Sequence, residues 1–153
     1  MKRFIVCNNC GGRISNLLED QIELDFSGRS EEMLLRTGQY GIDNSGDYYI
    51  SISDKHNLSY HHDLTRMQGC CGASVNGLPN LVCICKSAIG REVTDCCTAH
   101  YVVLYKKGIT LKEDTTGLLA EILNLSVDDE TKSQYEILFH FGEIASVLVE
   151  LRK

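Results

Sequence analysis

The sequence has little proline and few basic residues. One proline among 153 residues, with 43% hydrophobic and 24% charged residues, fits neither a disordered chain nor a fibrous repeat. Fifteen lysine and arginine residues face 21 aspartate and glutamate residues, which gives a net charge of -6. Binding along nucleic-acid phosphates depends on clustered basic residues, so we do not expect nucleic acid as a partner.

Long apolar segments are also missing. The longest apolar stretches, 81–85 and 101–105, fall far short of the roughly 18 consecutive apolar residues that a membrane helix needs. The apolar residues after Lys2 and Arg3 are too few for the core of a signal peptide, which takes about 7–15. These patterns predict a cytoplasmic protein with no membrane partner.

Familiar catalytic motifs are absent from the sequence. It contains no His-Glu-x-x-His, no Gly-x-x-x-x-Gly-Lys loop, no Gly-x-Ser-x-Gly elbow and no Pro-Cys-x-x-Cys half of a deaminase site. The sequence therefore favours a protein that is not an enzyme, although it does not decide the question.

The length predicts one domain over 1–153, with a β-rich portion over 1–110 and a helical portion over 111–153. Strands are expected over 2–7, 47–53, 81–85 and 100–105, an exposed loop over 69–79, and one or two helical turns over 31–36.

From about residue 114 the apolar spacing becomes helical, as in Leu118, Leu119, Ile122 and Leu123. A hairpin over 134–150 is the alternative to a helix there. The expected fold class is α+β, with helices packed on a zinc-clipped β region.

Eight cysteines are the most informative residues. A reducing cytosol disfavours disulfides, so closely spaced cysteines indicate metal ligation. Cys7-x-x-Cys10 and Cys83-x-Cys85 each follow a strand-like segment and look like two halves of one site. A tetrahedral zinc holds four thiolates at about 2.3 Å, and two facing turns can supply them. The sequence therefore predicts a zinc site formed by Cys7, Cys10, Cys83 and Cys85.

The first of these halves, Cys7-Asn8-Asn9-Cys10-Gly11-Gly12, resembles a zinc-ribbon knuckle, whereas Cys83-x-Cys85 is one residue shorter than that pattern. The resemblance covers the two knuckles only and implies a small metal-clipped β element. Proteins with such knuckles include nucleic-acid binders, docking modules and enzyme accessories, so the resemblance does not define a function. The surroundings of the remaining cysteines resemble cysteine-rich bacterial proteins.

A second zinc site is predicted from Cys70, Cys71, Cys96 and His100. Adjacent cysteines on an extended chain point to opposite faces, so Cys70 and Cys71 need an irregular loop, which the neighbouring glycines permit. Cys96 and His100 would lie about 13 Å apart in a strand, so a turn between them is required. Cys97 is an alternative to Cys96. One cysteine of each adjacent pair could instead be a small buried hydrophobic residue. The sequence therefore predicts one zinc ion at the first set of cysteines and a second at Cys70, Cys71, Cys96 and His100.

The functional hypothesis is a non-enzymatic zinc-binding protein that acts as a protein-interaction module. Its acidic composition suits a basic protein partner, and an inhibitor or immunity-type protein is one concrete form. The alternatives are a zinc-ribbon accessory of nucleic acid or transcription and a zinc-dependent enzyme whose second site, with His100, has an open position.

Overall fold

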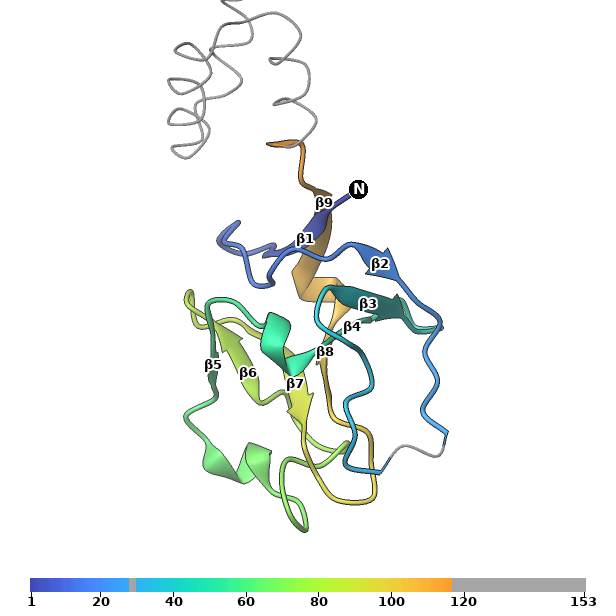
Figure 1. Cartoon of the computed structure of the whole chain (residues 1–153). Coiled ribbons are helices and arrows are strands. Elements are labelled where there is room, and N and C mark those ends of the chain that lie inside the picture. Colours follow the sequence, from blue (N-terminus) through green and yellow to red (C-terminus); the bar gives the residue numbers. More distant parts are fainter. Residues whose placement is uncertain (28–29, 117–153) are drawn as a thin grey trace, which may run out of the picture. The chain divides into compact units, whose positions relative to one another are not determined.

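The computed structural model describes residues 1–27 and 30–116 (Figure 1). The chain divides into the units Met1–Glu113 and Asp114–Lys153, and every element named below belongs to the first. The residues behind the helix prediction, from Leu118 on, and the alternative hairpin over 134–150 lie outside the described residues. Within the described residues, no helix has the length and apolar character needed to cross a membrane.

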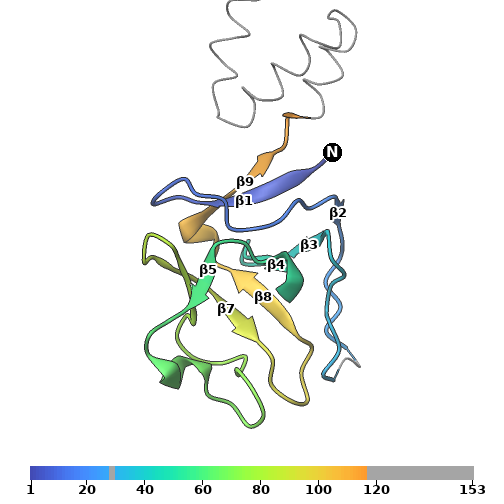
Figure 2. The same cartoon turned by 60° about the vertical axis from the view of Figure 1, so that its left-hand side comes forward.

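The unit Met1–Glu113 is built from two β-sheets (Figures 1 and 2). The smaller sheet pairs β1 (Arg3–Cys7) with β9 (Ile109–Glu113) in antiparallel register. The larger has seven strands in the order β2 (Asp20–Gln21), β3 (Gln39–Ile42), β4 (Tyr48–Ile50), β8 (Tyr101–Leu104), β7 (Ala88–Val93), β6 (Leu81–Cys83) and β5 (Leu58–Tyr60). Its neighbouring strands are antiparallel except β2 and β3, which are parallel.

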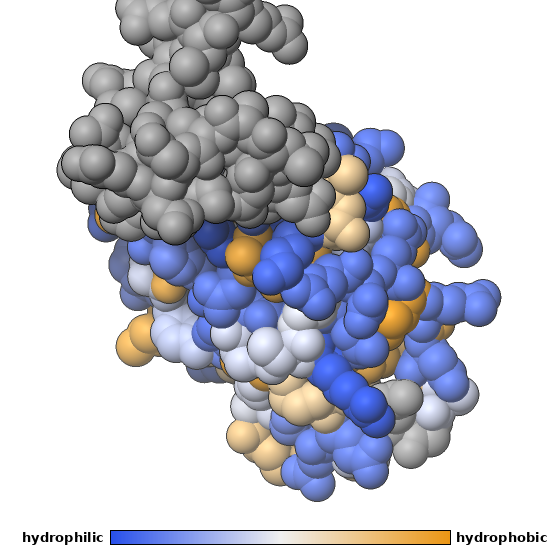
Figure 3. Space-filling model, turned by 45° about the horizontal axis from the view of Figure 1, so that its top comes forward, coloured by the Kyte–Doolittle hydropathy of each residue, from blue (hydrophilic) through white to orange (hydrophobic). Residues whose placement is uncertain are grey.

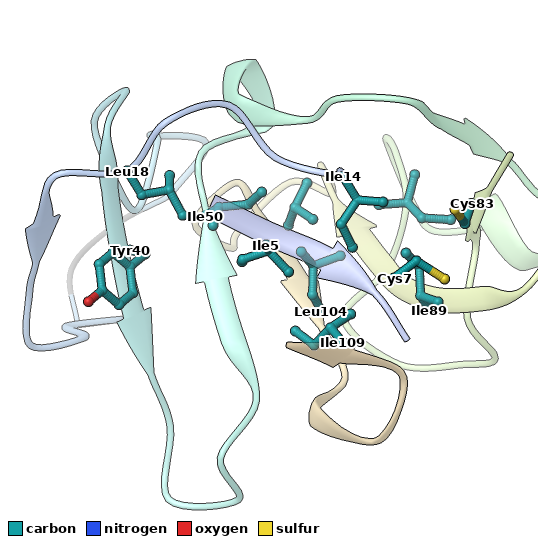
Figure 4. Close-up of a cluster of buried hydrophobic side chains, with 12 residues drawn as sticks. Ile5, Cys7, Ile14, Leu18, Tyr40, Ile50, Cys83, Ile89, Leu104 and Ile109 are labelled. Atoms are coloured by element: carbon teal, nitrogen blue, oxygen red, sulfur yellow. The ribbon is translucent and has the colours of Figure 1, made fainter. Parts of the chain in front are cut away.

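The centre of the larger sheet is buried on both faces, as β8 shows. Successive residues of a strand point to opposite faces. Val102 and Leu104 enter a first core cluster, whereas Tyr101 and Val103 enter a second one with Leu34, Leu35, Val93 and Ala99. The first core cluster joins the two sheets, and Cys7 and Cys83 lie together near one end of it while Leu18 and Tyr40 lie near the other (Figure 4). It comprises Ile5, Cys7, Ile14, Leu18, Tyr40, Ile50, Leu81, Cys83, Ile89, Val102, Leu104 and Ile109.

Several predicted strands are confirmed. The segments 2–7, 47–53, 81–85 and 100–105 contain β1, β4, β6 and β8, each shorter than the apolar pattern suggested. The predicted loop over 69–79 contains no strand or helix. Apolar and β-branched residues therefore predicted where the strands lie, whereas the turns at the strand ends set how long the strands are.

The α+β fold class is wrong for the described residues, which are rich in strands. Within the described part of the unit Met1–Glu113, the helical elements are the short 3₁₀ turns η1 (Ile52–Asp54), η2 (Leu64–Met67) and η3 (Lys106–Gly108). The predicted helical portion began at residue 111, but β9 continues to Glu113 and pairs with β1 as far as Arg3. Alternation over Ile109–Glu113, with Ile109 buried and Thr110 exposed, is the strand signal that the helix prediction overlooked.

The helical turns predicted over 31–36 are also wrong. This segment runs beside residues 98–100, where the amide of Glu31 donates to the carbonyl of Thr98 at 2.8 Å and that of Leu34 to His100 at 3.0 Å. Buried Leu34 and Leu35 cover one face of the larger sheet. Tertiary hydrogen bonds thus replaced the local ones of a helix.

Tyrosines whose pKa is raised by folding make the fold sensitive to alkali. Burial raises the pKa of Tyr49, Tyr60, Tyr101 and Tyr105, and at Tyr49 a hydrogen bond to Asp43 raises it further. A tyrosine whose pKa is raised on folding stabilises the protein below its unfolded pKa of about 10, and that stability is lost as the pH rises through the folded pKa. We expect the free energy of unfolding to fall above about pH 10. Denaturant unfolding at pH 8 and at pH 11 measures this decrease in the free energy of unfolding, and the decrease should be smaller in Tyr49→Phe. An equal decrease in the variant and the wild type would contradict the role of Tyr49.

Candidate metal centres

The first knuckle is the turn that follows β1. Val6 bridges to Arg13, the amide of Cys7 donates to Gly12 O at 2.9 Å, and the amide of Gly11 donates to Cys7 O at 2.8 Å. Gly11 has a φ of 71°, the left-handed region that glycine adopts without strain. The amide of Gly12 donates a hydrogen bond to Cys10 Sγ at 3.4 Å. The chain therefore reverses in a closed turn carrying both sulfur atoms.

The second knuckle repeats this turn with one residue fewer, between β6 and β7. Val82 pairs with Ala88, the amide of Cys83 donates to Ser87 O at 2.9 Å, and the amide of Lys86 donates to Cys83 O at 2.8 Å. Lys86 has a φ of 73° and thus takes the conformation that Gly11 has in the first knuckle. The missing residue therefore shortens the turn but keeps its closing hydrogen bonds.

The two knuckles bring four sulfur atoms together. Cys7 Sγ lies 3.7 Å from Cys85 Sγ, Cys10 Sγ lies 3.6 Å from Cys83 Sγ, and all four lie within 4.8 Å of one another. In a tetrahedron with metal–sulfur bonds of about 2.3 Å, neighbouring sulfur atoms are about 3.8 Å apart. These four residues, the first cysteine cluster, can therefore hold one metal ion.

Burial divides the first cysteine cluster into an inner and an outer pair. Cys7 and Cys83 are buried among the apolar residues of the first core cluster, whereas Cys10 is exposed and Cys85 partly exposed. Burial raises the pKa of Cys83 to about 12. Hydrogen bonds from the Asn9 side chain, at 3.3 Å, and from Ser87 lower the pKa of Cys85 to about 5. Asn9 belongs to the first knuckle, so it also links the two turns.

A second group of thiols comes from the loops at 69–73 and 94–97. The sulfur atoms of Cys70, Cys71 and Cys96 lie within 4.8 Å of one another, with 3.8 Å between Cys70 Sγ and Cys71 Sγ. We call these three residues the second cysteine cluster. Cys70 and Cys71 are exposed and Cys96 is partly exposed. The predicted irregular loop is present, and it brings two adjacent cysteines to one side.

Two glycines make this loop. A Cβ atom at position 69 would lie 2.1 Å from Gly72 O and 2.5 Å from a carboxylate oxygen of Asp95. A Cβ atom at position 72 would lie 2.4 Å from Thr94 O. Since neither backbone can accept a side chain, the Gly-Cys-Cys-Gly sequence is required for the close approach of the two loops.

Asp95 holds the second cysteine cluster in place. Its carboxylate accepts hydrogen bonds from the amides of Cys70 at 3.2 Å, Cys71 at 2.8 Å and Cys96 at 2.9 Å. These amide hydrogen bonds lower the pKa of Asp95, so the carboxylate is charged at neutral pH. Sequence reasoning missed Asp95, because an aspartate beside two cysteines signals nothing until the loops are folded.

His100 is not part of the second cysteine cluster. Its Nε2 atom lies 3.1 Å from the carbonyl oxygen of Asp95. A carbonyl oxygen only accepts hydrogen bonds, so Nε2 donates its proton, and neither ring nitrogen of His100 joins the group of ligand atoms that lie within 4.8 Å of one another. Of the adjacent cysteines, Cys96 contributes to the cluster and Cys97, with a φ of 62°, does not. Among the described histidine, cysteine and acidic residues, no fourth ligand joins the three sulfur atoms.

Comparison of the chain with protein-family models, with curated proteins and with solved structures finds no match in any of the three.

Proposed function

We propose that the chain is a zinc-binding protein in which Cys7, Cys10, Cys83 and Cys85 hold a structural zinc, and that it acts as a non-enzymatic protein-interaction module. The observation that carries the zinc proposal is the spacing of the four sulfur atoms, 3.6 and 3.7 Å between knuckles far apart in the sequence. Four thiolates leave a zinc ion no open position, which suits a structural role and not hydrolysis.

The zinc proposal is tested on the purified chain by elemental analysis and X-ray absorption. A structural zinc in the first cysteine cluster predicts four sulfur neighbours at about 2.3 Å. A light-atom shell with nitrogen or oxygen neighbours, or less than half a zinc per chain, would contradict it.

An exposed apolar residue at the second knuckle supports a protein partner. Ile84 lies between Cys83 and Cys85 and is 74% exposed. A metal-bound turn would hold this side chain rigidly in solvent, which lowers the entropy cost of docking it into a partner. On the face seen in Figure 3, hydrophilic residues predominate and hydrophobic residues are scattered. An exposed apolar side chain at a rigid turn therefore suits a local anchor better than a broad apolar interface.

Charge supports a basic partner. The sequence has a net charge of -6, and a zinc on four thiolates adds a further charge of about -2 because the thiols lose their protons. Association with a basic protein would be steered electrostatically and would slow as the salt concentration rises. An inhibitor or immunity-type protein that neutralises a basic protein is the concrete form of this proposal.

The same charge predicts negligible binding to nucleic acid. Fluorescence anisotropy with labelled single-stranded and duplex oligonucleotides, at about 0.15 M salt where the screening length is about 8 Å, should show no binding at micromolar protein. The zinc-loaded wild type and the Ile84→Ser variant should behave alike in this assay. Micromolar or tighter binding that weakens with salt would replace the protein-partner proposal by a nucleic-acid accessory with a zinc ribbon.

A further inference from the structure

The two cysteine clusters differ in the number of ligands and in exposure. The first has four sulfur atoms, two of them on buried residues, whereas the second has three, none on a buried residue. Structural zinc sites in proteins are almost always four-coordinate. His100, the sequence's candidate for a fourth ligand, donates its Nε2 proton to Asp95 O, and neither of its ring nitrogens joins the three sulfur atoms. The second cysteine cluster is therefore not a second copy of the first.

We propose that Cys70, Cys71 and Cys96 form a three-thiolate site for a soft monovalent cation, copper(I), separate from the zinc of the first cysteine cluster. Thiolates are soft ligands, and copper(I) is the soft cation that such ligands select. With its filled d shell, copper(I) is satisfied by three thiolates in a plane and needs no fourth ligand. Sulfur atoms within 4.8 Å of one another can contact one such ion together.

The cluster is organised without the ion. Gly69 and Gly72 allow the two loops to touch, and the Asp95 carboxylate fixes the amides of all three cysteines. Across the two loops, the amide of Thr94 donates to Ala73 O at 3.0 Å, and the amide of Ala73 donates to Thr94 Oγ1 at 3.1 Å. A ligand set held this way loses little conformational entropy when it binds. Asp95 is thus a positioning residue for the metal.

The exposure of the cluster suits exchange of the ion. Cys70 and Cys71 are exposed, so a donor or acceptor thiol can reach a bound copper(I) ion from solvent. In the first cysteine cluster, by contrast, two of the four thiols, those of Cys7 and Cys83, are buried, so the ion would be reached only from the side of Cys10 and Cys85. The second cysteine cluster therefore fits a site that takes up and releases its ion, in addition to any role of the zinc.

The test uses the zinc-loaded full-length chain and copper(I), supplied without oxygen as its acetonitrile complex against the chelator bicinchoninate. The wild type should bind one copper(I) per chain and release no zinc. Cys70→Ser and Cys96→Ser should lose that copper, whereas Cys97→Ser, which alters an exposed neighbouring thiol outside the cluster, should bind as the wild type does. Asp95→Asn should weaken copper binding by about 10–100-fold while zinc content stays unchanged.

Three outcomes would overturn this proposal. Release of one zinc for each copper bound would place the copper in the first cysteine cluster. Equal losses in Cys97→Ser and Cys96→Ser would show that no defined set of three thiols is used. A second zinc that resists copper(I) and disappears in Cys96→Ser would make the cluster a zinc site with a further ligand. Because zinc is measured in every sample, failure of the structural-zinc proposal is seen separately.

Discussion

Replacing Cys83 with serine is expected to leave the chain without zinc and without a cooperatively folded first unit. A structural zinc bound by thiolates contributes about 10–16 kcal/mol of apparent binding free energy at pH 7, and this is folding free energy because the site does not exist in the unfolded chain. A domain is typically stable by only about 5–15 kcal/mol. If the loss of one of the four thiolates releases the zinc, the protein loses a contribution as large as the whole free energy of unfolding of a typical domain.

The position of Cys83 makes the effect larger. It ends β6 at 1% exposure and belongs to the first core cluster, so the zinc would tie the turn after β1 to the seven-stranded sheet. Without the ion, this link would depend on weak contacts between thiols, such as the 3.6 Å approach of Cys10 Sγ to Cys83 Sγ. A hydroxyl buried there without a partner adds a cost of about 1–3 kcal/mol.

The measurement is circular dichroism during thermal unfolding, together with zinc content. Cys83→Ser should show no cooperative transition, and the wild type should lose its transition after long exposure to a strong chelator. Cys97→Ser is the matched control, because Cys97 is exposed and belongs to neither cysteine cluster. It should keep the wild-type midpoint and zinc content. A Cys83→Ser protein that melts like the wild type would show that the first cysteine cluster is not structural.

The first cysteine cluster could be predicted because its signal is local. Each pair of cysteines follows a strand and ends in a turn, and two such turns with two thiols each make up one tetrahedral set. The missing residue in Cys83-x-Cys85 did not prevent this, because Lys86 takes the left-handed conformation that Gly11 takes in the longer turn. What the sequence did not reveal was Asn9, whose contact with Cys85 crosses from one turn to the other.

The second cysteine cluster could be predicted only in part, because its geometry is set by tertiary contacts. The adjacent cysteines and their glycines indicated an irregular loop, but the choice between Cys96 and Cys97 depends on the left-handed backbone at Cys97. His100 satisfied the spacing rule for a ligand, but its Nε2 atom donates to the Asp95 carbonyl and neither of its ring nitrogens joins the three sulfur atoms. Spacing alone does not show which hydrogen bonds compete for a histidine.

The fold prediction failed where long-range pairing outweighed local pattern. Strand positions followed from apolar residues, but the partner of β1 is β9, more than 100 residues away in the sequence. Residues 31–36 have a helical composition, yet their amides bond to 98–100. Such pairing depends on the whole arrangement of strands and leaves no local signal.

A buried ion pair also went unnoticed in the sequence, and it carries a second large effect. Glu92 on β7 is 3% exposed, and its carboxylate binds the Lys55 ammonium and accepts the Tyr60 hydroxyl at 2.7 Å. The Lys55 ammonium also lies 5.0 Å from the centre of the Tyr60 ring. The backbone of Glu92 is fixed by the buried Asn80 side chain, whose Oδ1 accepts its amide at 2.7 Å. The backbone of Glu92 is therefore held in place beside Lys55 and Tyr60.

Removing the cation alone is expected to destabilise the protein strongly. Lys55→Met keeps most of the length of the side chain but leaves the Glu92 carboxylate buried with only Tyr60 as a partner, which costs about 3–5 kcal/mol. Burial lowers the pKa of Lys55, but its hydrogen bond to Glu92 and the charge of Glu92 outweigh burial and raise the pKa above its usual value. The wild-type pair is therefore intact at neutral pH, and its contribution is lost only above about pH 10.4, as Lys55 deprotonates.

Denaturant unfolding at pH 7.5 of single and double variants separates the ion pair from simple packing. Lys107→Met, at an exposed lysine of η3, is the matched control and should change the free energy of unfolding by less than about 0.5 kcal/mol. Lys55→Met combined with Glu92→Met should recover most of the lost stability, because two apolar side chains of similar volume leave no buried charge. If the double variant is no more stable than Lys55→Met, the loss comes from packing around Lys55 and not from an unpaired carboxylate.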